Sequence, residues 1–146
     1  MKTNITVTIR SFHTDCFGHV HHGRYVELLE EGRWAYMENN PSIAASLHRE
    51  GIDHAVVHLE ISYRGEARLG DRLQVETEVH RAGCHGITLR QVMVNKRTGM
   101  QVLSADVTNV FYRGMLGNKV PAGDPAFECW EDLQNVIKST DKEDDK

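Results

Sequence analysis

Residues 12–25 hold the densest group of side chains that could perform chemistry. The segment reads Phe-His-Thr-Asp-Cys-Phe-Gly-His-Val-His-His-Gly-Arg-Tyr and holds four of the nine histidines, at positions 13, 19, 21 and 22. Its one carboxylate is Asp15. A carboxylate can attack an acyl carbonyl directly, or it can remove a proton from a water that attacks. The segment is therefore the first candidate for a catalytic site.

The same segment runs into an expected helix of about residues 23–38. A helix N-terminus offers unpaired backbone N–H groups and a partial positive charge. Such groups stabilise an oxyanion when a reacting carbonyl sits against them. Asp15 lies just ahead of the helix, so its carboxylate could face the same place.

Each of these residues also has a simpler role. Asp15 could cap its turn by accepting hydrogen bonds from backbone N–H groups two or three residues on. His19, His21 and His22 could belong to a polar surface loop or, with Asp15, ligate a metal, although their spacing matches no standard zinc motif. Cys16 could be a nucleophile beside a histidine or an inert thiol.

The composition bounds the function classes. The chain has 146 residues, 40% of them hydrophobic and 26% charged, which fits one globular domain. A formal net charge of −4 argues against a nucleic-acid-binding surface. Cys16, Cys84 and Cys129 form neither a disulfide framework nor a zinc cassette and are expected to be reduced thiols. No apolar run approaches the roughly 20 residues of a membrane span, and no signal peptide is visible, so a cytoplasmic protein is expected.

Periodicity predicts the elements that position the segment. Alternating Ile5, Val7 and Ile9 predict a strand at about 3–10. The helix at 23–38 carries one apolar stripe, made of Tyr25, Leu28, Leu29, Gly32 and Tyr36. A glycine there costs about 1 kcal/mol relative to alanine, which suggests close packing of another backbone. A shorter helix is expected at about 41–50.

From residue 55 onward the period changes to two. Alternating rows at 57–63, 73–79, 87–93 and 103–111 predict four more strands, joined by short turns. A loop at 114–125 and a short helix at 126–137 should follow. We expect residues 1–137 to form one domain and the polar residues 138–146 to be disordered. The order predicts an α+β domain with a five-stranded antiparallel sheet, whose second face is polar or seeks a partner.

Two stretches resemble the 4-hydroxybenzoyl-CoA thioesterase family of the hotdog fold, which includes the YbgC-like acyl-CoA thioesterases. The first is Asp15-x-x-Gly18-His19-Val20-x-His22-x-x-Tyr25, followed by Glu30-x-x-Arg33. The second is Leu59-Glu60-Ile61-Ser62-Tyr63-Arg64 followed by Ala67-Arg68-Leu69-Gly70-Asp71, which is similar to the family's second strand and the turn after it. The resemblance covers about residues 5–113.

The resemblance implies a hotdog fold, in which the sheet wraps around one long central helix. It implies hydrolysis of an acyl-CoA substrate without a cofactor or metal. It also implies a homodimer or homotetramer joined through the sheets, with active sites at the subunit interface.

The resemblance also implies roles for single residues. Asp15 matches the catalytic carboxylate, as nucleophile or general base, and the backbone N–H of residue 22 matches the donor to the thioester carbonyl. His22 matches a histidine of the YbgC-like branch, whose role as acid/base partner, orienting group or pocket wall stays open. Gly18 and His19 are expected at the substrate. Tyr25 matches a site-lining aromatic that could equally belong to the core.

The coenzyme A phosphates need basic partners. Arg64 and Arg68 are the candidates, with Arg90 and Arg81 behind them, and each could instead be a solvated surface arginine.

One departure bears on the site. Many relatives read His-Val-Asn-Asn where this chain reads His-Val-His-His, so an amide that could cap the helix is lost at position 22. Glu30 and Glu31 lie beside the helix stripe rather than within it, which disfavours a branch with a helix-borne catalytic glutamate. The rival functions are a non-hydrolytic acyl-thioester-binding or dehydratase hotdog protein, and a metal-binding module. The sequence does not specify the acyl group.

Overall fold

The computed structural model describes residues 2–83, 86–114 and 117–144. Its elements follow the expected order of a strand, a long helix, a shorter helix and then four strands. The bounds are β1 Thr3–Thr8, a 3-10 turn η1 Ser11–His13, α1 His22–Glu38, α2 Pro41–Arg49, β2 Ile52–Tyr63, β3 Arg72–Gly83, β4 Gly86–Asn95, β5 Gln101–Arg113, β6 Asn118–Lys119, a 3-10 turn η2 Pro125–Phe127 and α3 Glu131–Asp144.

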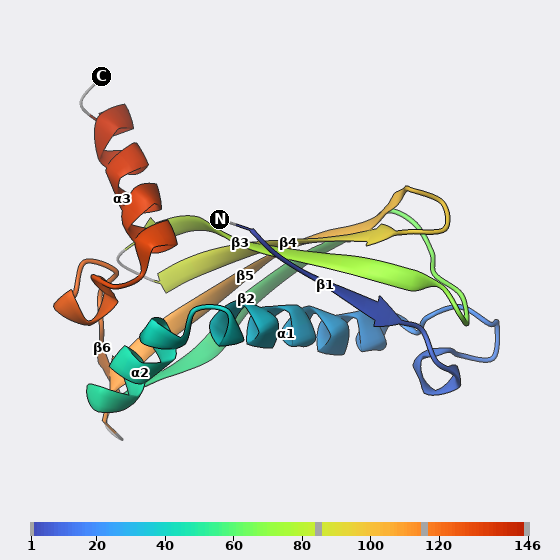
Figure 1. Cartoon of the computed structure of the whole chain (residues 1–146), viewed down its shortest axis with the longest axis horizontal. Coiled ribbons are helices and arrows are strands. Elements are labelled where there is room, and N and C mark those ends of the chain that lie inside the picture. Colours follow the sequence, from blue (N-terminus) through green and yellow to red (C-terminus); the bar gives the residue numbers. More distant parts are fainter. Residues whose placement is uncertain (1, 84–85, 115–116, 145–146) are drawn as a thin grey trace.

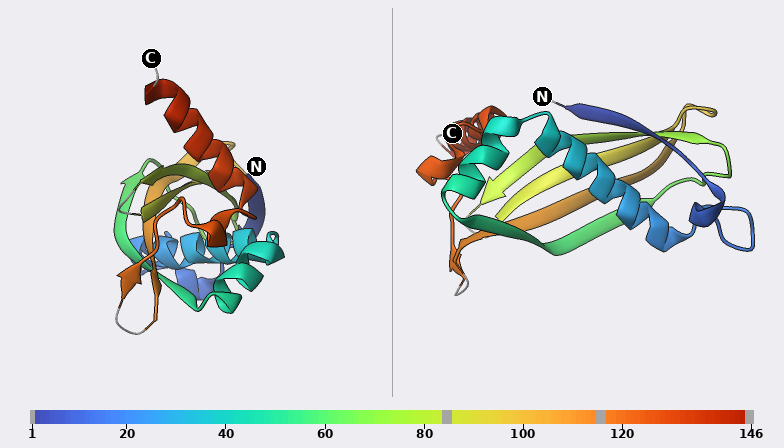
Figure 2. Two further views of the ribbon diagram at one scale, coloured as in Figure 1. Left: turned by 90° about the vertical axis from the view of Figure 1, so that its left-hand side faces the viewer. Right: turned by 60° about the horizontal axis from the view of Figure 1, so that its bottom comes forward.

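The five long strands form one antiparallel sheet in the order β1-β3-β4-β5-β2, and the two-residue β6 pairs with β5. Seen end-on, the sheet curves around α1 (Figure 2), and α2 follows at the far end of that helix (Figure 1). This arrangement confirms the predicted α+β hotdog fold. None of the helices in the described part of the chain is long and apolar enough to cross a membrane.

The C-terminal region differs from expectation in three ways. β6 and the first residue of η2 lie in the segment 114–125, which was expected to be a loop. The Asp124 side chain caps η2 by accepting from Ala126 N. α3 begins at Glu131 rather than 126, because the η2 turn comes first. It continues to Asp144 through residues expected to be disordered, with the Ser139 and Thr140 hydroxyls donating to carbonyls four residues earlier.

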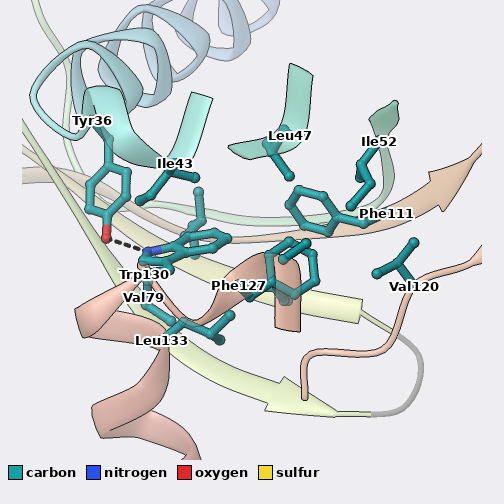
Figure 3. Close-up of a cluster of buried hydrophobic side chains, with 13 residues drawn as sticks. Tyr36, Ile43, Leu47, Ile52, Val79, Phe111, Val120, Phe127, Trp130 and Leu133 are labelled. Carbon is teal, nitrogen blue, oxygen red and sulfur yellow. Dashed lines mark hydrogen bonds between the residues drawn. The ribbon is translucent and has the colours of Figure 1, made fainter. Parts of the chain in front are cut away.

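The core lies between α1 and the concave face of the sheet. α1 buries the five predicted stripe residues, Tyr25, Leu28, Leu29, Gly32 and Tyr36. Each large apolar side chain buried in this way contributes about 1.5–3 kcal/mol. At the C-terminal end of α1, Tyr36 meets an aromatic cluster from β5, η2 and the residue before α3 (Figure 3).

The middle of α1 touches the sheet most closely at Gly32. A Cβ atom at Gly32 would lie 2.7 Å from Val75 Cγ1 and 2.9 Å from Gln91 Nε2, so the packing is close, but against side chains of the sheet rather than the backbone that the sequence suggested. The fully buried Gln91 donates from Nε2 to Leu29 O (2.8 Å) and to Thr77 Oγ1 (2.9 Å). Its Oε1 accepts from Arg33 Nη1 at 3.0 Å. The helix is thus fixed to the sheet in position and in rotation.

β2 is the least covered strand. It lies at an edge of the sheet and pairs only with β5 among the described strands. Val56, Leu59 and Tyr63 of β2 are exposed, as is Trp34 on the adjacent face of α1, with 58% of its surface accessible. A free edge beside exposed apolar side chains is suited to pairing with another chain.

Candidate active site

The loop of residues 14–20 folds tightly on itself ahead of α1. Thr14 and Val20 pair as an isolated antiparallel bridge, and Asp15 N donates to His19 O at 2.9 Å. Gly18 N donates to Asp15 O at 3.1 Å, and Gly18 has a φ of +80°, which favours glycine. The backbone thus holds Asp15 in a fixed position.

Asp15 caps its own turn, as one of the two readings of the sequence expected. Its Oδ1 accepts from Phe17 N at 2.9 Å. The side chain is half-buried, and Oδ2 receives no hydrogen bond from the described residues. Capping and catalysis are therefore compatible, because the turn orients the carboxylate and leaves one oxygen available.

The start of α1 is capped by His21, a role that the sequence did not indicate. His21 Nδ1 accepts from Gly23 N at 3.1 Å, and His21 O accepts from Arg24 N at 2.8 Å. Histidine is not among the preferred capping residues, so no pattern pointed to it. The N–H of His22 has no acceptor within the described chain. That donor stands free at the positive end of the helix.

The His22 side chain is exposed, and its ring stacks on His21 with centroids 4.4 Å apart. The carbonyl of His22 accepts from the hydroxyl of Tyr63, which lies at the end of β2, at 3.0 Å. Tyr63 thereby ties the first turn of α1 to the sheet. The sequence placed Tyr63 in a strand, but only the fold brings the end of that strand to the start of the helix.

Tyr25 lies in the core beneath the site. It is 4% exposed and its ring packs at 5.7 Å from that of Tyr63. Burial raises the pKa of Tyr25, so the phenol stays neutral. Of its two expected locations, the structure shows the core.

His19 belongs to an exposed charge cluster beside the loop. Its Nε2 lies 3.0 Å from Glu66 Oε2, and Arg68 Nη2 lies 3.2 Å from Glu66 Oε1. The backbones of His19 and Arg68 form an isolated bridge. Glu66 was missed by the sequence analysis, because only this bridge brings the segment after β2 to the loop.

The other candidate arginines differ in their surroundings. The Arg64 side chain is exposed and has no ion pair among the described residues. Arg90 is engaged by Asp106 Oδ1 at 3.0 Å, on the paired strands β4 and β5. Arg81 lies further along β3 and is exposed. Of the four candidates, Arg68 is the one that the structure brings to the loop, through its bridge with His19.

Asp71 holds the segment after β2 in place. The buried carboxylate accepts from Arg97 Nε at 2.7 Å, from Arg68 N at 3.0 Å and from Asn95 Nδ2 at 2.9 Å. The hydrogen bond from Arg97 is the main reason that the pKa of Asp71 lies well below its usual range. The segment in turn supports the loop, since Val20 N donates to Ala67 O at 3.0 Å.

The remaining histidine of the segment is structural. His13 is buried, and its Nδ1 accepts from Arg10 N at 2.8 Å. Burial lowers the pKa of His13, which keeps the imidazole neutral. Within the described ranges, no three His, Cys, Asp or Glu side chains are arranged to hold a metal ion. Cys16 and Cys129 are exposed free thiols, and Cys84 lies outside the described residues.

Comparison with known proteins agrees with this arrangement. Residues 10–128 match the family model described as "Thioesterase-like superfamily". Over 110 residues the chain is 34% identical to the long-chain acyl-CoA thioesterase FadM of Escherichia coli strain K12, covering 75% of this chain and 81% of that protein.

Solved structures give the same result. The probable thioesterase YbaW from Escherichia coli superposes with a TM-score of 0.79 at 29% identity, covering 91% of this chain and 98% of that one. A mutant 4-hydroxybenzoyl-CoA thioesterase, solved with 4-hydroxybenzoyl-CoA, superposes with a TM-score of 0.75 at 18% identity, covering 88% and 97%, which supports the fold. The chain belongs to the thioesterase-like superfamily and is an acyl-CoA thioesterase with a hotdog fold.

Proposed function

We propose that Asp15 is the catalytic carboxylate of this thioesterase and that the backbone N–H of His22 is its oxyanion donor. One observation carries the proposal: a carboxylate held by its own turn, with Oδ2 unengaged, precedes a helix whose first N–H has no acceptor in the described chain. A nucleophile or base and an oxyanion donor are the two parts that acyl transfer needs.

The thioester carbonyl oxygen would accept from the His22 N–H. The partial positive charge of the α1 N-terminus would then stabilise the negative charge that develops on that oxygen. Asp15 acts by one of two routes. As nucleophile, Oδ2 adds to the carbonyl carbon, the C–S bond breaks, coenzyme A leaves as thiolate, and water hydrolyses the resulting anhydride. As base, Oδ2 takes a proton from water, hydroxide adds, and the departing thiolate later takes up the proton.

The side chains around Asp15 would shape the substrate site. Gly18 allows the tight loop because its φ of +80° strains other residues. His19, whose carbonyl accepts from Asp15 N, and the exposed ring of His22 would contact the substrate. Tyr25 would act from beneath, through Tyr63, rather than by touching the substrate.

The coenzyme A phosphates would lie beside the segment that follows β2. Arg64 has no ion pair among the described residues, and Arg68 is exposed beside it. Arg68 and Arg97 also line a cleft of about 310 Å³ between this segment and the β4–β5 turn. Arginine is well suited to phosphate because its planar guanidinium donates two parallel hydrogen bonds.

We propose a long-chain acyl group as the substrate class. The support is the relative at 34% identity, which is a long-chain acyl-CoA thioesterase. Exposed apolar side chains on α1 and β2, including Trp34 and Leu59, lie along the elements that lead away from the site and suit an alkyl chain better than a polar acyl group.

The working unit is proposed to be a homodimer, with a homotetramer as the alternative. The support is the outer edge of β2, which is unpaired among the described strands, and the exposed apolar side chains beside it. Edge-to-edge pairing would remove the free edge and bring a second copy close to Tyr63 and the start of α1. Action in the cytoplasm stays a prediction.

The direct test is release of free coenzyme A thiol from a panel of acyl-CoAs by the purified protein and by Asp15→Ala. We expect the variant to remain folded and dimeric and to lose about 10²–10⁴-fold in kcat/KM. Trapping an acyl-enzyme in a single turnover would assign the nucleophilic route. Retained activity across the panel would remove Asp15 from the mechanism.

A further inference from the structure

A cavity of about 270 Å³ lies between the second half of α1 and the sheet, at the end of the molecule away from Asp15. Its lining is mostly apolar and comes from every layer of the fold: Trp34 from α1, Val56 from β2, Leu89 from β4, Phe111 from β5, and Trp130 from the segment just before α3. Its size is near the lower end of small-molecule sites.

One face of α1 connects the cavity to the proposed oxyanion donor. His22, Val26, Glu30 and Arg33 follow one another at spacings of three or four residues, so they share that face. Glu30 and Arg33 line the cavity. At about 1.5 Å per residue, the path along the helix from residue 22 to residue 33 is about 16 Å.

β2 runs beside the same face in the opposite direction. Its last residue, Tyr63, bonds to His22 O, whereas Val56 lines the cavity. Val56 and Leu59 pair with the buried Asn109 and Val107 of β5, so their side chains lie on the concave side of the sheet. An exposed strip between α1 and β2 therefore leads from the start of the helix into the cavity.

The far wall of the cavity is built by Trp130 and Tyr36. Trp130 is 3% exposed, and its Nε1 donates to the Tyr36 hydroxyl at 2.9 Å (Figure 3). The Tyr36 hydroxyl in turn donates to Asp132 Oδ2 at 2.6 Å. The Trp130 ring also packs edge-on against Phe111, with centroids 6.1 Å apart. Trp130 lies beyond residues 10–128, the part that matches the family model.

We propose that this cavity receives the distal end of the acyl chain and that Trp130 is the wall that sets the longest chain accepted. The inference rests on the proposed long-chain substrate and adds a residue that determines its length. With C–C bonds of about 1.5 Å, an extended alkyl chain advances about 1.25 Å per methylene, so the path holds about 13 carbons. The wall thus stands where a long acyl chain would end.

The test is kcat/KM for a series of saturated acyl-CoAs from hexanoyl to eicosanoyl. Trp130→Ala should move the longest well-used chain upward, with the ratio of long-chain to short-chain kcat/KM rising about tenfold, since one or two methylenes in a pocket are worth about that factor. Trp130→Phe keeps an aromatic wall and should stay near the wild-type ratio.

A second variant changes an exposed residue that lines the cavity. Val56→Phe should fill part of it and lower the same ratio about tenfold. Val57→Phe adds the same ring at the next position of β2, which does not line the cavity, and should keep the wild-type ratio. Sedimentation of each variant checks that its assembly state matches that of the wild type.

The ratio of long-chain to short-chain kcat/KM is thus expected to rise in Trp130→Ala and to fall in Val56→Phe. If Trp130→Ala does not fold, Val56→Phe against Val57→Phe decides alone. Wild-type chain-length ratios in the folded, active variants would overturn the assignment of the cavity and leave the thioesterase proposal intact. A wild-type protein that releases no thiol from any acyl-CoA would instead overturn the function itself.

Discussion

At the scale of single residues, the loop before α1 divides its polar side chains between structure and chemistry. His13 and His21 accept hydrogen bonds from backbone N–H groups, which accounts for two of the four histidines. Asp15 holds the turn through Oδ1, and Oδ2, which is unengaged among the described residues, is proposed to perform the chemistry. His22 remains with an exposed ring whose backbone, rather than its side chain, is the proposed donor.

For His22 this division predicts a small effect. His22→Ala keeps the backbone N–H, so we expect kcat/KM to fall less than tenfold, well below the effect of a group that transfers a proton. Steady-state kinetics on a long-chain acyl-CoA measures it. A loss of 100-fold or more, with an altered pH profile, would make the imidazole an acid/base group.

Asp71 predicts how stability depends on pH. Its pKa in the folded protein lies below the ordinary 3.8, chiefly because Arg97 hydrogen-bonds to the carboxylate. Between the folded and unfolded pKa values, the unfolded chain binds a proton that the folded protein does not. The unfolding free energy therefore decreases as the pH is lowered through that window. The stabilisation should be complete above about pH 4–5 and should decline as the pH falls below 3.8.

Urea unfolding of wild type and Asp71→Asn from pH 7 to pH 3 tests this. The difference between their unfolding free energies should be constant at the upper end and shrink at the lower end. A difference that is the same at every pH would show that the carboxylate charge contributes nothing there.

At the scale of elements, α1 is fixed at its start and in its middle by the sheet, and at its end by the segment before α3. Tyr63 holds its first turn, Gln91 bonds to its centre, and Tyr36 anchors its last turn to Trp130. Gly32 lets the helix approach the sheet at the level of Gln91. A shift of the helix away from the sheet would therefore also move the His22 N–H relative to Asp15.

Gly32→Ala tests that close approach. Alanine is the better helix former by about 1 kcal/mol, but its Cβ would clash with Val75 Cγ1. We expect a net loss of about 1–3 kcal/mol in the unfolding free energy, typical of an overpacked core. Glu31→Ala, on the exposed side of the same helix, is the matched control and should change stability little. A Gly32→Ala variant that is more stable than wild type would contradict the close packing.

At the scale of the whole molecule, the unpaired β2 edge beside apolar side chains points to assembly. Leu59→Lys places a charge on this strand and should shift the protein towards monomer. Leu69→Lys, on the turn before β3, is a control that is also exposed. Analytical ultracentrifugation with parallel activity assays measures both. A fully active monomer would show that one chain suffices.

Local patterns predicted most of the fold. Alternation predicted the five long strands, the apolar stripe predicted α1, and Gly32 predicted close packing. The motif drew attention to Asp15 and residue 22 because they adjoin the helix start in sequence. The features that the sequence did not predict depend on contacts between distant segments: Tyr63 with His22, Glu66 with His19, and Trp130 with the cavity. The helical residues 138–144 were missed because they carry no apolar stripe.

Asp15→Asn tests the central claim most directly. Asparagine can still accept the hydrogen bond from Phe17 N, so the turn should survive while the charge is lost. The measurement is kcat for a long-chain acyl-CoA, with crystal structures of both proteins to confirm an unchanged loop. We predict an intact loop and a fall of about 10²–10⁴-fold in kcat. An intact loop with near wild-type kcat would mean that Asp15 only caps its turn, and the account of catalysis would be wrong.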